Sequence, residues 1–159
     1  MIAQLKVLLR VKNLKLDQAL RAMLVKRQQH EAAVAATARA RAALAESEAT
    51  YAAREDAIYT EILRMVVDQG EVDETRGRVV QLEKDHMALK DDVERALHVE
   101  ARVESELDAA VARYNHAMRV RDKFAIITDD VKRELEAVQE AREEIEIEDL
   151  FSKRRKQAA

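Results

Sequence analysis

Apolar residues recur at every seventh position along most of this chain. The row in the first half is apolar or aromatic at eight of its ten positions: Ile2, Leu9, Leu16, Met23, His30, Thr37, Leu44, Tyr51, Ile58 and Met65. The row in the second half is apolar at all ten: Leu82, Leu89, Ala96, Val103, Ala110, Ala117, Phe124, Val131, Val138 and Ile145. A seven-residue repeat of this length is the signature of a coiled coil, because about 3.5 residues per turn keeps one seam facing a partner helix. The pattern predicts an all-α fold, a long antiparallel two-helix coiled-coil hairpin.

The seam is better defined in the second half than in the first. A second row from Val72 to Leu135 is largely apolar, whereas its counterpart in the first half is interrupted by Arg27, Arg41 and Glu48. Residues 32–45 are nearly all Ala, which favours helix strongly but buries little surface. We therefore expect the first helix to pack more weakly around this stretch.

A turn is expected where the two rows meet, in the segment VVDQGEVDE at residues 66–74. Gly70 suits the left-handed position after a helix end, and Asp73 suits the cap of the next helix. This predicts a single domain over residues 1–159, with a helix at 2–68, a turn at 69–72, a helix at 73–150 and a charged tail at 151–159. A register shifted by seven residues would align the apolar rows equally well, so Gly70 alone selects the register.

The register set by Gly70 pairs large residues with small ones in several layers, as close packing requires. The expected pairs are Ile58 with Leu82, Tyr51 with Leu89, Leu44 with Ala96, Met23 with Ala117, Leu16 with Phe124, Leu9 with Val131, and Ile2 with Val138. Residues from about 139 onward would then extend past the partner helix.

Composition argues against a compact globular domain. The chain has no Pro, Trp or Cys and only two Gly, so it lacks the usual turn residues, and aromatic side chains make up only 3%. Absence of Cys excludes disulfides and thiol catalysis and fits a reducing compartment. No apolar run approaches the roughly 18 residues of a membrane span, and the N-terminal sequence does not resemble a secretory signal. We expect a soluble cytoplasmic protein without direct membrane insertion.

Charge is segregated along the chain. Residues 1–30 contain seven basic residues and one acidic residue, whereas residues 129–150 contain ten acidic and three basic residues. The two stretches would face each other in the expected hairpin, and their attraction would favour antiparallel pairing. An alternative is that these are solvated charges, each worth only tenths of a kcal/mol. A binding partner better explains the acidic block after 139 and the basic residues 153–156 that follow it.

Catalytic chemistry is not expected. The four His residues lack partners at metal-site spacing, and the sequence has no Gly-rich phosphate loop and no Ser–His–Asp set that two helices could converge on one pocket. The sequence thus predicts a non-enzymatic protein without cofactor or metal. Nucleic-acid binding is also not expected, because the basic residues 153–156 adjoin an acidic block without interleaved aromatic residues.

Two stretches resemble the YscO family of bacterial type III secretion, whose flagellar counterpart is FliJ. The N-terminal LLRVKNLKLDQAL contains an RVK run at 10–12, and the C-terminal EEIEIEDLFSKRRKQ has the acidic–aromatic–basic order of the family. The resemblance implies a central stalk whose paired termini enter a hexameric secretion ATPase. It also implies contacts with an export-gate protein and, in some members, substrate chaperones. The expected location is cytoplasmic, peripheral to the inner-membrane secretion apparatus.

The resemblance and the charge pattern together place the ATPase-binding end at the termini and not at the turn. The expected partner-binding residues are Lys6, Arg10, Lys12, Lys15, Glu143, Glu144, Glu146, Glu148, Phe151, Arg154 and Arg155. A structural coiled-coil assembly protein of another bacterial system is the main alternative. A lipid-binding amphipathic helix is disfavoured because the apolar stripes are narrow.

Overall fold

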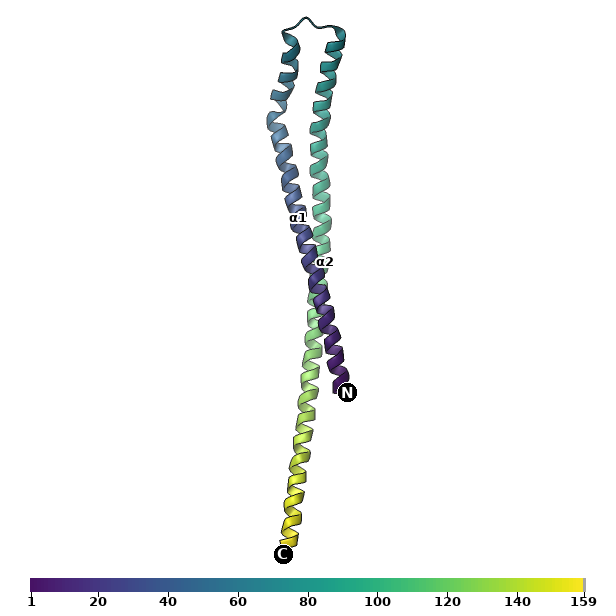
Figure 1. Cartoon of the computed structure of the whole chain (residues 1–159), viewed down its shortest axis with the longest axis vertical. Helices are drawn as coiled ribbons and strands as arrows, with labels where there is room; N and C mark the ends of the chain where they lie inside the picture. The colour runs from purple at the N-terminus through teal and green to yellow at the C-terminus, as the bar shows by residue number, and fades with distance from the viewer. Residues whose placement is uncertain (159) are drawn as a thin grey trace. The chain divides into compact units, whose positions relative to one another are not determined.

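The computed structural model describes residues 1–158 and contains two helices, α1 (Ile2–Leu63) and α2 (Gln69–Ala158), with no strand in that range (Figure 1). The two long helices pack together as an all-α hairpin, so the predicted fold class is confirmed. Contacts divide the chain into two units, which are described separately. Unit 1 comprises Met1–Met23 with Ala110–Ala159, and unit 2 comprises Leu24–Ala109. The expectation of a single domain stays a prediction.

The turn in unit 2 occupies residues 64–68, earlier than the expected 69–72. At the end of α1 the Met65 amide donates a hydrogen bond to the Ile62 carbonyl at 3.3 Å. At the start of α2 the Glu71 amide donates to Asp68 Oδ1 at 2.8 Å, and the Asp68 amide donates to Glu71 Oε2 at 2.9 Å. This reciprocal pair is a capping box, which satisfies two amides that a helix start leaves without intrahelical partners.

The expected roles of Gly70 and Asp73 were wrong. No glycine has a positive φ among the described residues, and Gly70 lies in the first turn of α2 in helical conformation. Asp73 is an exposed residue inside the helix, and Asp68 caps it instead. The physical reason is that the Asp68–Glu71 capping box starts α2 before Gly70 is reached, so the chain does not need a left-handed residue there.

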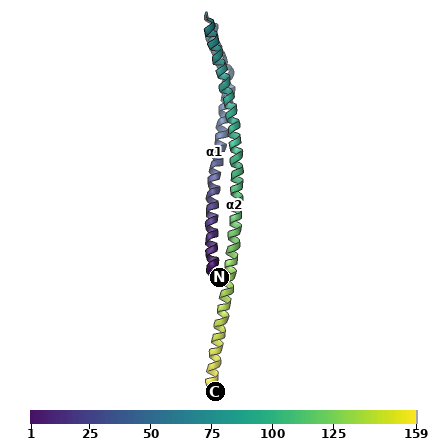
Figure 2. The same ribbon diagram turned by 90° about the vertical axis from the view of Figure 1, so that its right-hand side faces the viewer.

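The register of unit 2 differs from the expected one by about a heptad. Figures 1 and 2 both show the α1 and α2 segments of this unit side by side. The Ser47 hydroxyl lies 2.8 Å from His86 Nδ1, whereas the expected register places Ser47 opposite Val93. Lys26 Nζ lies 2.6 Å from Glu106 Oε2, a contact displaced in the same direction. The expected layers were therefore wrong, because the earlier turn selects the other alignment that the seven-residue repeat allows.

The core of unit 2 is thin. Its buried residues on α1 are small, namely Ala33, Thr37 and Ser47, while α2 contributes Thr75, Leu82 and Val103. Thr37 retains a partner, since its hydroxyl donates to the Ala33 carbonyl at 3.1 Å. The small α1 side chains match the patchy apolar row of the first half, and no described large side chain is completely buried.

In unit 1 the α1 segment packs against only part of the α2 segment. Met23, Ala110 and Thr128 are buried, and Lys12 Nζ lies 5.1 Å from the centroid of the Phe124 ring, a cation–π contact. The Thr128 hydroxyl donates to the Phe124 carbonyl at 2.7 Å, which satisfies it inside the helix.

Every described residue from 132 onward is exposed, and we refer to residues 132–158 as the C-terminal extension. It begins before the expected position near 139. Val138, expected to face Ile2, has 48% of its surface exposed. The second helix also does not end at 150: residues 151–158 of the expected charged tail are helical, and residue 159 lies outside the described residues. The earlier start follows from the heptad shift, because α1 ends its contact with α2 sooner.

Candidate interaction surfaces

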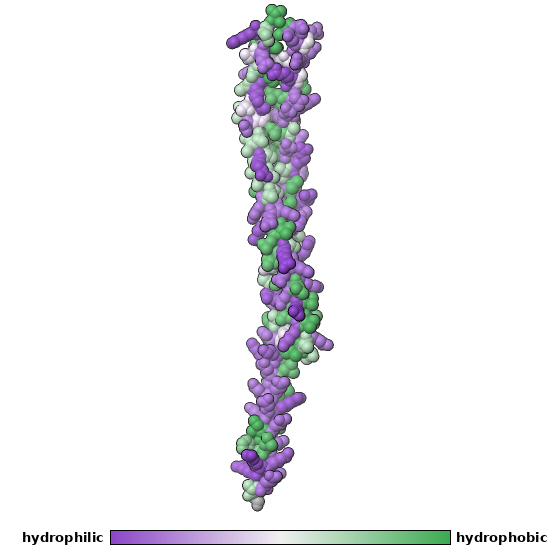
Figure 3. Space-filling view, viewed as in Figure 1, coloured by the Kyte–Doolittle hydropathy of each residue, from purple (hydrophilic) through white to green (hydrophobic). Residues whose placement is uncertain are grey.

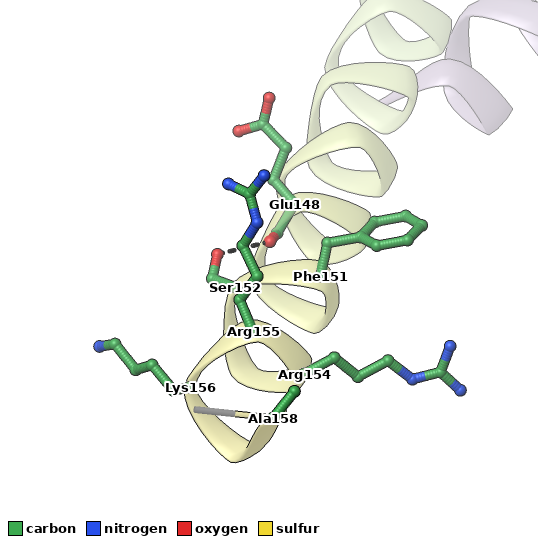
Figure 4. A pocket seen from close by; sticks show the side chains of 7 residues that line it. All are labelled: Glu148, Phe151, Ser152, Arg154, Arg155, Lys156 and Ala158. Atoms are coloured by element: carbon green, nitrogen blue, oxygen red, sulfur yellow. Dashed lines mark hydrogen bonds between the residues drawn. The ribbon is translucent and has the colours of Figure 1, made fainter.

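One hollow of the described residues lies at the C-terminal end of α2. It has a volume of about 920 Å³ and is lined by residues between Glu148 and Ala158, all on one helix (Figure 4). Residues 1–158 contain no group of three His, Asp or Glu side chains placed to hold a metal ion. None of the helices described is both long and apolar enough to cross a membrane.

One candidate surface is an apolar face on the C-terminal extension, formed by Ile147, Leu150 and Phe151. These side chains are more than half exposed and, with Arg154, line a hollow of about 290 Å³. Leu150 and Phe151 follow Ile147 by three and four residues and Arg154 follows it by seven, which places the four side chains on one side of the helix. Figure 4 shows Phe151 and Arg154 projecting to the same side, with Lys156 opposite. Apolar surface also gathers near the C-terminal end in Figure 3, bordered by hydrophilic surface.

The extension carries charge in two blocks. The acidic block consists of Glu140, Glu143, Glu144, Glu146, Glu148 and Asp149, with Arg142 among them. The basic block consists of Lys153, Arg154, Arg155 and Lys156. None of these residues forms an ion pair with another described residue, and the extension's recorded pair joins Lys132 and Glu136. Because these charges are exposed and unpaired within residues 1–158, they are available to a partner.

The predicted basic residues lie on α1 in the same unit. Lys6, Arg10 and Lys15 are exposed, and Lys12 is partly covered by its contact with Phe124. A hollow of about 210 Å³ is lined by Lys12, Lys15, His116, Ala117 and Val120. The structure thus brings Lys12 and Lys15 to one groove and Glu148, Phe151, Arg154 and Arg155 to another.

The basic stretch at 1–30 and the acidic stretch at 129–150 were expected to face each other, and for most of their length they do not. Among the described residues, no ion pair joins residues 1–30 to residues 129–150. The ion pair from the basic stretch to α2 is Lys26–Glu106, in unit 2. The reason is again the register, since most of the acidic residues lie in the extension, where α1 does not cover them.

A surface that sequence reasoning missed lies at the turn. Leu63, Met65 and Val66 are exposed, with Val66 fully so, and we call them the apolar turn. Close by, Arg78 Nη1 on α2 lies 2.5 Å from Glu61 Oε2 on α1 and ties the two helices together. Placing the turn at residues 64–68 from the capping box would have revealed this surface.

The perturbed titrating groups belong to contacts between helices. The hydrogen bond and charge of Lys26 hold the pKa of Glu106 below its ordinary value, despite some desolvation. Arg78 lowers the pKa of Glu61 in the same way. Desolvation raises the pKa of Tyr51, with Glu55 and Glu83 adding to the effect. These shifts reflect packing and ion pairing along the seam.

The Ser47–His86 contact brings together a hydroxyl and an imidazole, two of the three groups of a Ser–His–Asp triad. Arg54 Nη2 donates to the Ser47 hydroxyl at 2.8 Å, and the Tyr51 ring packs against the His86 ring with centroids 5.2 Å apart. No carboxylate among the described residues is hydrogen-bonded to His86 to orient it as a base. The contact forms a polar layer between the two helices of unit 2.

A model of the family described as "Type III secretion protein YscO" matches residues 5–153. The chain belongs to the YscO family. The crystal structure of type III secretion protein YscO from Vibrio parahaemolyticus has the same fold, with a TM-score of 0.82 and 19% sequence identity over 93% of each chain. No curated protein matches in sequence. The predicted resemblance is confirmed, and this YscO protein is a component of a type III secretion apparatus. The family match includes most of the extension but ends before Arg154.

Proposed function

We propose that this YscO protein is a non-enzymatic stalk that binds the hexameric secretion ATPase through its C-terminal extension and links it to the export gate. The observation that carries the proposal is the extension itself. Residues 132–158 are helical, exposed throughout, and carry an apolar face between two blocks of unpaired charge. Family membership supports the role in secretion, and the ATPase and the gate are the proposed partners.

The extension has the features of a helix that completes its packing on another protein. An isolated helix in water gains little stability from its backbone alone, and helices in proteins depend mainly on packing of an apolar face. Ile147, Leu150 and Phe151 form such a face, which α1 leaves uncovered. An amphipathic helix of this kind docks in an apolar groove through residues spaced by three and four positions. The acidic block supplies charge for basic groups at the rim of the groove.

The apolar turn is the proposed contact for the export gate. Leu63, Met65 and Val66 belong to unit 2, whereas the extension belongs to unit 1, so different residues would serve the two partners. This allows one chain to hold both at once, as linkage requires. Substrate chaperones stay a further predicted class of partner. The alternative of an assembly protein from another system loses its support, because the family match places the chain in type III secretion.

Co-purification with the ATPase hexamer tests the proposal. A chain ending at residue 131 lacks residues 132–158, all of which are exposed, so its helix pairing should survive while ATPase binding is lost. The matched control replaces Leu63, Met65 and Val66 by Ser at the turn and should retain ATPase binding but lose the export gate. Retention of the ATPase by the chain ending at 131 would refute the proposed site.

A further inference from the structure

The order of charges along the C-terminal extension makes it complementary to itself. The acidic block at 140–149 begins before the apolar face and reaches Asp149, beside Ile147 and Leu150, and the basic block at 153–156 follows Phe151. We propose that the extensions of two copies of this chain pair antiparallel through Ile147, Leu150 and Phe151, with the acidic block of each copy against the basic block of the other, forming a homodimer. This inference does not rest on the proposed ATPase contact.

Charge decides the direction of this pairing. Two parallel copies would bring acidic block against acidic block and basic block against basic block. Like charges at close range are unfavourable, whereas antiparallel copies place opposite charges together at both ends of the contact. A two-fold axis near residue 149 achieves this with one surface used twice, as a symmetric dimer requires.

The helical positions provide specific partners. Glu143, Glu144 and Arg154 lie on the same side of the helix as Ile147, because they are separated from it by three, four or seven residues. With the two-fold axis near residue 149, Ile147 of one copy lies against Phe151 of the other. Glu143 and Glu144 then reach Arg154 and Arg155 of the second copy.

A third pair forms at the edge of the same contact, where Glu146 of one copy meets Lys153 of the other. The symmetry repeats each pair, so both ends of the apolar face are closed by opposite charges. Most of these charges stay near water, where an individual pair contributes little. They therefore choose direction and register, while the apolar residues supply most of the affinity.

The dimer should be weak. Each copy contributes only a few helical turns. The surface area buried between them should therefore be smaller than the roughly 1,000 Å² expected of a stable interface. The free chain therefore exchanges between monomer and dimer according to its concentration. Any protein that occupies the apolar face would displace the second copy.

Sedimentation velocity of the full chain over a range of concentrations at low salt tests the dimer. We expect the sedimentation coefficient to rise with concentration. A variant with Glu143→Lys, Glu144→Lys and Glu146→Lys, and a second with Lys153→Glu, Arg154→Glu and Arg155→Glu, should each self-associate at least about tenfold more weakly, the loss of roughly 1.4 kcal/mol.

Mixing the two charge-reversed variants distinguishes the proposed pairing from simple damage. In the mixture, every reversed charge meets an opposite charge, so association should return to the parent level. The matched control Asp91→Lys, Glu94→Lys and Asp108→Lys reverses three exposed acids of unit 2 and should associate like the parent. A parent that stays monomeric at every concentration overturns the proposal. So does a mixture that associates no better than its separate components.

Discussion

Replacing Leu82 by Ala should destabilise the hairpin much more than replacing Leu150 by Ala. Both residues lie on α2, but Leu82 is 8% exposed in the seam of unit 2 and Leu150 is 64% exposed on the extension. Burying a Leu side chain contributes about 1.5–3 kcal/mol. Leu→Ala changes in closed cores cost about 2.7–5 kcal/mol because a cavity remains. A two-helix seam is open at its sides, so we expect about 2 kcal/mol for Leu82→Ala.

The control should change little. Leu150→Ala removes a side chain that is mostly in water already, so the free energy of unfolding should fall by less than about 0.5 kcal/mol. Urea unfolding followed by far-UV circular dichroism measures both variants, with an unchanged slope showing that the midpoint reports stability. In thermal unfolding, the midpoint temperature of Leu82→Ala should be about 4–8 °C lower than that of the parent, because each kcal/mol corresponds to about 2–4 °C at this chain length. Equal losses in the two variants would refute the distinction between seam and extension.

Three smaller effects follow from the start of α2 and its ion pairs. Gly77→Ala should raise the free energy of unfolding by about 0.5–1 kcal/mol, because the added methyl meets no atom within 4 Å and Ala favours helix. A lower free energy of unfolding would contradict this. Asp68→Ala should cost about 0.5–2 kcal/mol by removing the cap, and Asp68→Asn should recover most of it in the same urea assay. Glu106 has a lowered pKa in the folded state because of Lys26. The pair therefore stabilises the folded chain at pH values above the ordinary carboxyl pKa, and this stabilisation is lost as the pH falls through the lowered pKa. Glu106→Gln should flatten that part of the stability–pH profile, and an unaltered profile would show that the pair contributes nothing.

The sequence predicted the two helices and their antiparallel pairing because heptad spacing is repeated many times. It did not determine the register, because a seven-residue repeat pairs equally well after a shift of seven. The register was set by the turn, where the Asp68–Glu71 capping box starts α2 before Gly70. The D-x-x-E spacing was visible in the sequence, but a glycine is the more familiar sign of a helix end.

The candidate site was predicted in part for the same reason. Exposure of Glu143, Glu144 and Phe151 follows from both the expected and the observed register, because α2 extends beyond α1 from about 139 in the first and from 132 in the second. The larger extent of the extension depended on the register, so it could not be derived from the heptad rows alone. Exposure of Val66 required the position of the turn. The partners themselves leave no mark in the packing of a single chain. Type III secretion was named from the resemblance of two short stretches, and the family match confirmed it.

The affinity of the chain for the secretion ATPase, measured with its effect on ATP hydrolysis, tests the central claim most directly. Reversing charge at Glu143, Glu144, Glu146 and Glu148 should weaken binding to the hexamer and reduce any stimulation of hydrolysis, while helix content stays nearly unchanged. The matched variant replaces Gln69 and Asp73, which are exposed near the turn and lie outside the Asp68–Glu71 capping box, and it should leave both quantities close to those of the parent. Loss of ATPase binding in the turn variant, with binding retained in the variant of the extension, would contradict the proposed orientation.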